Sequence, residues 1–292
     1  MSNPARFTGA LAAAVLAVAS FGQTADAAYF ADHVVSYDPG NATDYTDPNA
    51  ALGKPHHLVS EDTIYQSVLS PFNPAWETSQ LTRIGQGGHL TVQLSHYALP
   101  TAGLQLGVFV NVGLIDAGGW LSPTGQASNP AATFNAVEDS IVIEVSQDGL
   151  NFIALNNANP IVMNLPTNYY NNAGPYDVDP PANPEDADFA KTFNATLSDF
   201  DGLTWTQILD LLDGSAGGNW LDFSDTGLSQ VGYVRFSLPE NHPDTNADFE
   251  LLALAVAHDA LGSPVPEPGS AALLAAMLGA AALRRRRRAP AN

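Results

Sequence analysis

Residues 140–155, SIVIEVSQDGLNFIAL, contain the clearest fold signal in the sequence. Every second position of the first part is apolar, which is the pattern of a strand with one buried face. The residues of that face are Ile141, Ile143 and Val145. Asp148-Gly149 favours a hairpin turn, because both residue types tolerate positive φ, and residues 152–155 continue as a second apolar segment. The stretch therefore predicts two neighbouring antiparallel strands.

Similar segments recur across residues 28–262, where Gly and Pro separate short runs rich in Val, Ile, Leu, Phe and Thr. Residues 89–94 alternate in the same way. The other strand candidates are residues 104–112, 152–155, 231–238 and 249–257. Long helices of the kind that connect parallel strands are nearly missing, so antiparallel pairing is favoured. We expect an all-β body that forms a sandwich of two sheets.

One short helix is predicted over residues 204–212. Thr204 is a suitable N-cap, and Gly214 lies where a helix terminates. The apolar side chains between them are Ile208, Leu209, Leu211 and Leu212.

Charge is distributed unevenly along the 292 residues, whose net charge is −20. Residues 28–262 contain four basic and 28 acidic residues, so this body has a net charge of −24. Such a surface repels phosphate backbones, which argues against nucleic-acid binding, whereas it suits divalent cations. Cysteine is absent, so neither disulfides nor thiol chemistry is available.

Residues 1–27 follow the plan of a secretory signal peptide: Arg6 precedes an apolar stretch, and small residues follow it. We expect cleavage before Ala28 by signal peptidase. The positions that define this site are Ala25, Ala27 and Ala28. A buried first helix is the alternative interpretation, although no polar second face supports it.

Residues 263–292 read SPVPEPGSAALLAAMLGAAALRRRRRAPAN. Prolines block helix formation at the start, so a helix should begin near Gly269 and end at the arginines. Some 15 residues at 1.5 Å each reach about 22 Å, less than the roughly 30 Å of a bilayer core. This transmembrane helix is a marginal anchor. The arginines should stay on the cytoplasmic side, which places the body outside.

The ordered combination in residues 263–292 resembles the PEP-CTERM sorting signal of exported bacterial proteins. Its matching positions are Pro266, Glu267, Pro268, Arg284, Arg285, Arg286, Arg287 and Arg288. The resemblance implies that the helix holds the chain transiently in the inner membrane until a membrane protease of the exosortase type cuts near the Pro-Glu-Pro motif. Proteins with this signal occur in bacteria that make extracellular polysaccharide and biofilm matrix. The implied destination is therefore the cell surface or the extracellular space.

A second resemblance concerns the body. The segments GxGGxLTV at 85–92 and VSxDGxNF at 145–152, with SAGGNWLD at 215–222, are similar to stretches of bacterial surface proteins with a discoidin-like or galactose-binding-like jelly roll. It implies an antiparallel jelly-roll β-sandwich between the signal peptide (residues 1–27) and the sorting segment (residues 263–292). Such domains often bind carbohydrate through loops and hold structural calcium, but no binding triad of this type can be matched here.

The acidic loop DPGNATDYTD at residues 38–47 is a candidate calcium site, because calcium prefers carboxylate, amide and carbonyl oxygens. Its candidate ligands are Asp38, Asn41, Asp44 and Asp47. A solvated acidic loop without an ion is the competing interpretation. Residues 177–188 form a second acidic loop, to which the same two interpretations apply.

Aromatic residues in loop-like contexts are candidate sugar-stacking platforms, although core or edge packing is the default explanation for each of them. They are Trp76, Trp120, Tyr169, Tyr170 and Tyr176. Tyr169 and Tyr170 are the preferred ligand-binding pair, because the asparagines beside them add amide groups that suit sugar hydroxyls.

Motifs for catalysis are missing. Gly214-Ser215-Ala216-Gly217 lacks the G-x-S-x-G spacing of a serine nucleophile, and no HExxH sequence occurs. With 28 acidic residues, pairs of carboxylates arise by chance and predict no glycosidase. We therefore expect a non-catalytic protein that binds carbohydrate or associates with exopolysaccharide. A secreted polysaccharide hydrolase and a purely structural surface protein without a ligand are the alternatives.

Overall fold

The computed structural model describes residues 25–59, 67–111, 113–116, 124–127, 141–155, 171, 173–176, 183, 185–243 and 247–267. These residues form an all-β body with two antiparallel sheets and, within the described part, one short α-helix. The predicted fold class is confirmed at this level.

The larger sheet has six strands in the order β1-β3-β11-β7-β8, with β13 also paired to β3. Their bounds are β1 (Ala31–Asp38), β3 (His89–Ala98), β11 (Val231–Ser237), β7 (Val142–Ser146), β8 (Ile153–Ala154) and β13 (Leu261–Pro264). The smaller sheet has four strands in the order β10-β4-β12-β2. These are β10 (Asn219–Leu221), β4 (Leu106–Val110), β12 (Asp248–Val256) and β2 (Thr82–Gly85).

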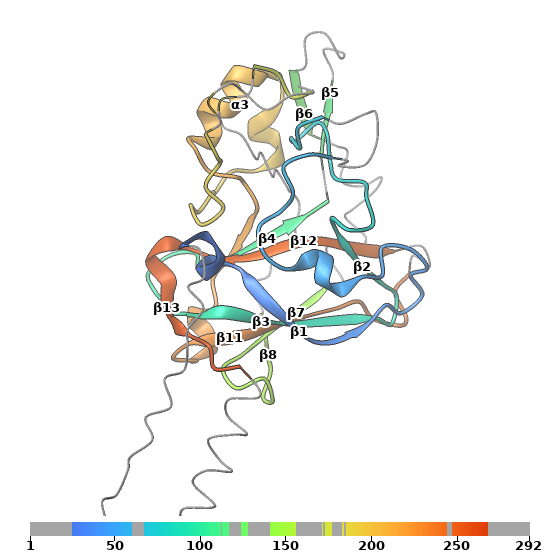
Figure 1. Ribbon diagram of the computed structural model, residues 1–292, viewed down its shortest axis with the longest axis vertical. Helices are drawn as coiled ribbons and strands as arrows, with labels where there is room; N and C mark the ends of the chain where they lie inside the picture. Colours follow the sequence, from blue (N-terminus) through green and yellow to red (C-terminus); the bar gives the residue numbers. More distant parts are fainter. Residues whose placement is uncertain are drawn as a thin grey trace, which may run out of the picture.

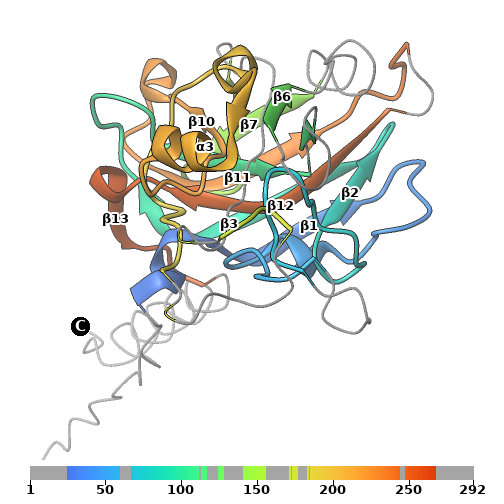
Figure 2. The same cartoon turned by 90° about the horizontal axis from the view of Figure 1, so that it is seen from above.

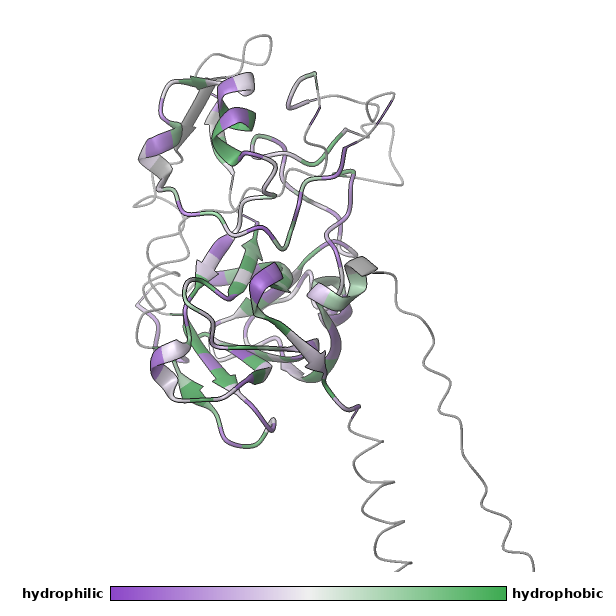
Figure 3. Cartoon of the chain, turned by 90° about the vertical axis from the view of Figure 1, so that its left-hand side faces the viewer, coloured by the Kyte–Doolittle hydropathy of each residue, from purple (hydrophilic) through white to green (hydrophobic). Residues whose placement is uncertain are grey.

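The two sheets lie one above the other, as Figure 1 shows for β4 and β12 over β3 and β11. Apolar rows on the facing sides fill the space between them. Leu90 and Val92 of β3 are fully buried, and Phe236 of β11 stacks on Phe249 of β12 with ring centroids 5.6 Å apart. Figure 3 shows the apolar residues concentrated on the strands.

A third, three-stranded sheet and the helix form a separate small cluster beyond the smaller sheet, on the side away from the larger sheet (Figures 1 and 2). It consists of β5 (Leu114–Asp116), β6 (Thr124–Ala127), β9 (Leu203–Thr204) and α3 (Trp205–Leu212). Trp205, Ile208 and Leu212 of α3 pack with Phe72 and Phe200 in a second core.

The predicted helix is confirmed with its ends. The Thr204 hydroxyl accepts from the Gln207 N–H at 3.5 Å, while the Thr204 N–H donates to Gln207 Oε1 at 2.9 Å, so the two residues form a capping box. Asp213 ends the helix in the left-handed region with φ 48°, and Gly214 follows at φ 82°.

The hairpin predicted from residues 140–155 is β7 paired antiparallel with β8, with Val145 opposite Ile153. Gly149 has φ 73°, as a turn requires, and Asp148 Oδ1 accepts from the backbone N–H groups of Leu150 and Asn151, both at 2.9 Å. The other predicted strand segments correspond to β3, β4, β11 and β12.

Five short 3-10 helices complete the described elements: η1 (Ala25–Tyr29), η2 (Pro48–Ala51), η3 (Leu197–Phe200), η4 (Ser224–Thr226) and η5 (His258–Ala260). At the other end of the body, β13 extends to Pro264, and Val265 is 6% exposed within the main core. The packed body thus continues three residues beyond the boundary expected at Gly262.

The two predicted processing segments are described only where they meet the body. Ala25, Ala27 and Ala28 belong to η1, and Pro266 and Glu267 follow β13. Residues 1–24, Pro268 and the five arginines lie outside the described residues, as does the apolar segment 271–283. In the part of the chain that is described, no helix has the length and apolarity needed to cross a membrane.

Candidate functional site

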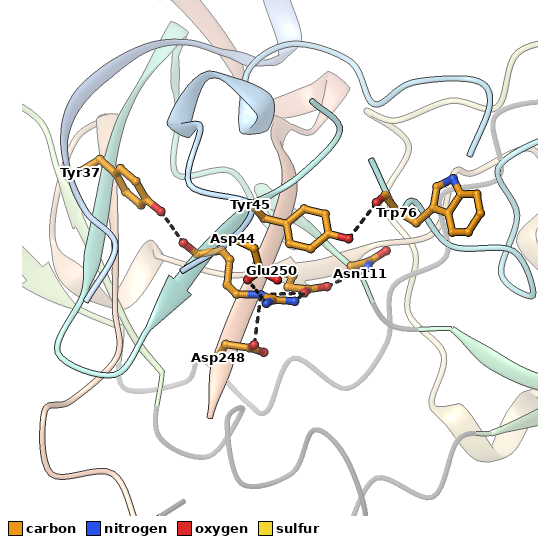
Figure 4. A network of polar contacts seen from close by, with 8 residues as sticks. Tyr37, Asp44, Tyr45, Trp76, Asn111, Asp248 and Glu250 are labelled. Carbon is orange, nitrogen blue, oxygen red and sulfur yellow. Dashed lines mark hydrogen bonds and ion pairs between the residues drawn. The ribbon is translucent and has the colours of Figure 1, made fainter. Parts of the chain in front are cut away.

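A cluster of charged side chains surrounds Arg83 at the edge of the smaller sheet (Figure 4). The Arg83 cluster consists of Arg83, Asp44, Asn111, Asp248 and Glu250. β2 and β12 pair antiparallel with Arg83 directly opposite Glu250, so the sheet register itself creates the central contact. Asp44 is added by the loop after β1, and Asn111 directly follows β4.

Each group of the cluster has a defined partner. Arg83 Nε donates to Glu250 Oε1 at 3.0 Å and lies 3.1 Å from Asp248 Oδ2. The two terminal guanidinium nitrogens contact Asp44 and Glu250. Asn111 Nδ2 donates to Glu250 Oε2 at 2.8 Å, while Asn111 Oδ1 is buried and has no hydrogen-bond partner among the described residues. The cluster therefore has three carboxylates around one guanidinium.

The charges determine the protonation of Arg83. Burial opposes its positive charge, but the hydrogen bond and the charge of Glu250, followed by the charges of Asp248 and Asp44, outweigh that effect and raise its pKa. Arg83 thus remains a fixed cation, and the three carboxylates leave a net negative charge in the cluster.

Tyr45 connects the cluster to an exposed aromatic residue. Its ring lies over the Arg83 guanidinium, 4.8 Å from Cζ to the ring centroid, and its hydroxyl donates to the Trp76 carbonyl oxygen at 2.8 Å. Burial, then the Glu250 charge, raises the pKa of Tyr45 above 10, so this hydroxyl is a donor at neutral pH. Figure 4 shows the Trp76 indole beyond Tyr45, pointing away from the cluster.

Trp76 has a fixed backbone and an exposed ring. The N–H groups of Trp76 and Glu77 both donate to Gln80 Oε1, at 3.3 and 3.1 Å, and Gln80 is buried. The Trp76 residue is nevertheless 52% exposed. An exposed aromatic ring, joined through Tyr45 to carboxylate, amide and guanidinium groups, offers both stacking and hydrogen bonding to a ligand.

The predicted calcium ligands have separate local roles. Asp38 Oδ1 accepts from the Gly40 N–H at 3.0 Å, Asn41 Oδ1 accepts from the Gln86 N–H at 2.7 Å, and Asp47 Oδ1 caps η2 by accepting from the Asn49 N–H at 2.9 Å. Asp44 contacts Arg83. Within the described ranges, no three His, Asp or Glu residues are arranged to hold a metal ion. Calcium at this loop therefore stays a prediction.

The predicted aromatic residues differ in their positions. Of the five, Trp76 is described as exposed, and Tyr176 is part of the second core beside Phe72, with its hydroxyl donating to Asp116 Oδ2 at 3.2 Å. Tyr169, Tyr170 and Trp120 lie outside the described residues, so the preferred ligand-binding pair is untested. Ser215 is buried, and its hydroxyl donates to the Lys191 carbonyl oxygen at 2.8 Å.

Sequence reasoning did not identify Arg83 and Glu250. One signal was present: only four basic residues occur in the body among 28 acidic ones, so each of them is expected to lie close to a carboxylate. That signal does not specify which acids are close.

Comparison with known proteins adds no assignment, because no family model matches the chain and no curated protein is a detectable relative. The function is therefore argued from the site and the sequence.

Proposed function

We propose that the chain is an exported, non-catalytic protein of the bacterial cell surface or extracellular matrix, and that it binds carbohydrate of the exopolysaccharide type. The proposed binding surface consists of Trp76, Tyr45 and the Arg83 cluster. In finer detail, the two sheets are proposed to form a galactose-binding-like jelly roll.

The exposed Trp76 ring, joined to the Arg83 cluster through the hydrogen bond of its carbonyl oxygen with Tyr45, is the observation that supports carbohydrate binding. A sugar presents an apolar C–H face and a rim of hydroxyl groups, and the surface offers a partner for each. The same groups suit nucleic acid poorly, since the carboxylates of the cluster would face phosphates.

The engagement of the carboxylates supports binding without catalysis. Asp248 and Glu250 both contact the Arg83 guanidinium, so oxygen atoms of both carboxylates are already engaged. A glycosidase needs one carboxyl group that carries a proton to the leaving oxygen, and a carboxylate held by a guanidinium is poorly suited to that role.

The processing route rests on the two ends of the sequence. Signal peptidase would act before Ala28, and an exosortase-type protease near Pro266-Glu267-Pro268, with the PEP-CTERM helix as a transient inner-membrane anchor. Mass spectrometry of the mature termini in the native host tests this route, and an intact, uncut chain would contradict it.

Binding is tested by polysaccharide pull-down and glycan arrays with the full-length protein, with calcium and with a chelator. We expect binding that is reduced at least about tenfold in Trp76→Ala, which corresponds to a loss of about 1.4 kcal/mol. The matched control is Leu150→Ala, which removes an apolar side chain that is 83% exposed on the β7–β8 hairpin. No binding under either condition, or equal binding by both variants, would contradict the proposed function.

A further inference from the structure

A pocket of about 260 Å³ lies apart from the Arg83 cluster and shares no residue with it. Its walls come from four parts of the chain: Tyr29 and Phe30 before β1, Lys54 after η2, the segment 186–190, and His258 of η5. The segment 186–190 overlaps the end of the acidic loop at residues 177–188, the second calcium candidate of the sequence.

Backbone hydrogen bonds fix one wall of the pocket, the segment 186–190. The Asp188 N–H donates to the Gly214 carbonyl oxygen at 2.8 Å, and the Ala216 N–H donates to the Asp188 carbonyl oxygen at 2.9 Å. On the other side, the His258 N–H donates to the Ala190 carbonyl oxygen at 3.0 Å. Segment 186–190 is thus fixed between two other parts of the body, and a ligand would not have to order it on binding.

The base of the pocket is apolar. Phe189 is 3% exposed and packs against Phe30 and Phe109, with ring centroids 6.0 and 5.0 Å apart. Lys54 Nζ lies 5.6 Å from the centroid of the Phe189 ring. The base therefore offers contact to C–H groups and one ammonium group above them.

The rim carries two charge pairs. Lys54 Nζ lies 2.7 Å from Asp186 Oδ2, and His258 Nε2 lies 2.7 Å from Asp188 Oδ2. The Tyr29 ring meets the His258 ring edge-on, with centroids 4.8 Å apart. The rim consequently offers hydrogen-bond donors and acceptors together. Its two carboxylates disfavour an anionic ligand, and the Lys54 ammonium group disfavours a strongly cationic one.

From this combination we propose that the pocket binds a single neutral sugar ring, such as one exposed unit of the polysaccharide. The inference rests on the proposed function and adds a second site to it. The ring would place C–H groups over the Phe189 base and direct hydroxyl groups to Asp186, Asp188, Lys54 and His258. A volume of about 260 Å³ lies below the roughly 300–1,000 Å³ of sites for drug-sized ligands, so the pocket admits one ring and not a longer segment.

The test uses the full-length protein with methyl glycosides of glucose, galactose, mannose and N-acetylglucosamine, and with a methyl glucuronide as the anionic comparison. Saturation-transfer NMR and calorimetry measure binding. We expect at least one neutral glycoside to bind saturably and more tightly than the glucuronide. Lys54→Met, which keeps the apolar stem over Phe189, and Asp188→Asn should each weaken binding at least about tenfold.

The matched control is Asp213→Asn. Asp213 also forms an ion pair, with Lys191 Nζ 2.8 Å from Asp213 Oδ2, but it lies at the end of α3 and does not line the pocket. The Asp213→Asn variant should bind the glycoside as the wild type does. The melting temperatures of all three variants establish that each is folded. Binding of no neutral glycoside, or unchanged binding by Lys54→Met and Asp188→Asn, would overturn the inference.

The Trp76→Ala variant separates this inference from the proposed function. It should lose polysaccharide binding and keep glycoside binding in the pocket. Glycoside binding without any polysaccharide binding would leave the pocket standing and contradict the proposed surface at Trp76. The reverse result would support the Trp76 surface and contradict the pocket.

Discussion

The Val265 N–H donates to the Ser95 carbonyl oxygen at a distance of 2.9 Å. The Ser95 hydroxyl also contacts the carbonyl oxygens of Ala27 and Ala28, at 3.0 and 2.8 Å. The Ser95 N–H donates to the Phe30 carbonyl oxygen at 3.0 Å. One residue of β3 thus holds the first and the last described segments of the body.

The buried Val265 should contribute to stability although it lies beyond the expected boundary of the body. We expect Val265→Ala to lower the free energy of unfolding by about 1–3 kcal/mol, because it removes two buried methyl groups. Val142→Ala, at a position that is 38% exposed, is the control and should cost less than about 1 kcal/mol. Urea denaturation measures both values, and equal losses would show that Val265 is not packed.

Alanine substitutions at Gly218 and Gly214 should distinguish the cost of backbone strain from the cost of steric overlap. Both have φ above 80°, but a Cβ on Gly218 would lie 2.7 Å from Phe109 Cε1, whereas one on Gly214 would meet nothing within 4 Å. Gly214→Ala should cost about 1–2 kcal/mol for the left-handed backbone. Gly218→Ala should cost about 1–3 kcal/mol more, because Phe109 must move. Similar denaturation midpoints for the two variants would contradict the packing at Phe109.

Asp148 should make the stability of the β7–β8 hairpin depend on pH. Hydrogen bonds from the Asn151 and Leu150 backbone lower its carboxyl pKa well below the usual 3.8. A lowered pKa in the folded state stabilises the protein above the unfolded value, and this effect is lost as the pH falls toward the folded value. The melting temperature of Asp148→Asn should therefore be below that of the wild type at pH 7, and the difference should shrink below pH 4. A difference that is constant with pH would contradict this role.

Tyr176 should ionise later than an ordinary tyrosine. Burial, followed by the charge of Asp116 and its hydrogen bond, raises the pKa of Tyr176 to about 12. Because the folded state holds the proton more tightly than the unfolded state, this stabilisation is complete below pH 10 and disappears as the pH rises toward 12. Ultraviolet difference titration between the wild type and Tyr176→Phe isolates the group. Asp116→Asn should move its pKa toward 10, and an unshifted titration would contradict the contact.

Most strands were predictable because their signals are local. The alternation at residues 89–94 and the Asp-Gly turn depend on neighbours in the sequence, and both β3 and the β7–β8 hairpin form where expected. Alternation was misleading for the other face of β3, where Thr91, Gln93 and Ser95 are polar and yet almost fully buried. Arg235 Nε donates to Thr91 Oγ1 at 3.1 Å, and Ser95 contacts the chain ends, so contacts distant in sequence account for that burial.

The candidate site could not be predicted from local sequence patterns. Arg83 and Glu250 are 167 residues apart, and only the register of β2 against β12 places them opposite each other. The acidic loop at residues 38–47 was predicted to bind calcium. In the structure, its Asp44 contacts the Arg83 guanidinium. A net charge of −24 made calcium the natural hypothesis, whereas the few basic residues of the body satisfy part of that charge themselves.

Because the first and the last segments of the described body both contact Ser95, the body is suitable for circular permutation. Ala28 and Val265 lie on either side of one residue, so a short linker could join them without crossing the sandwich. New termini could then be opened between Gln147 and Phe152, in the turn that joins β7 to β8. In the native chain, a force applied at Ala28 or at Val265 would therefore be transmitted to β3 first.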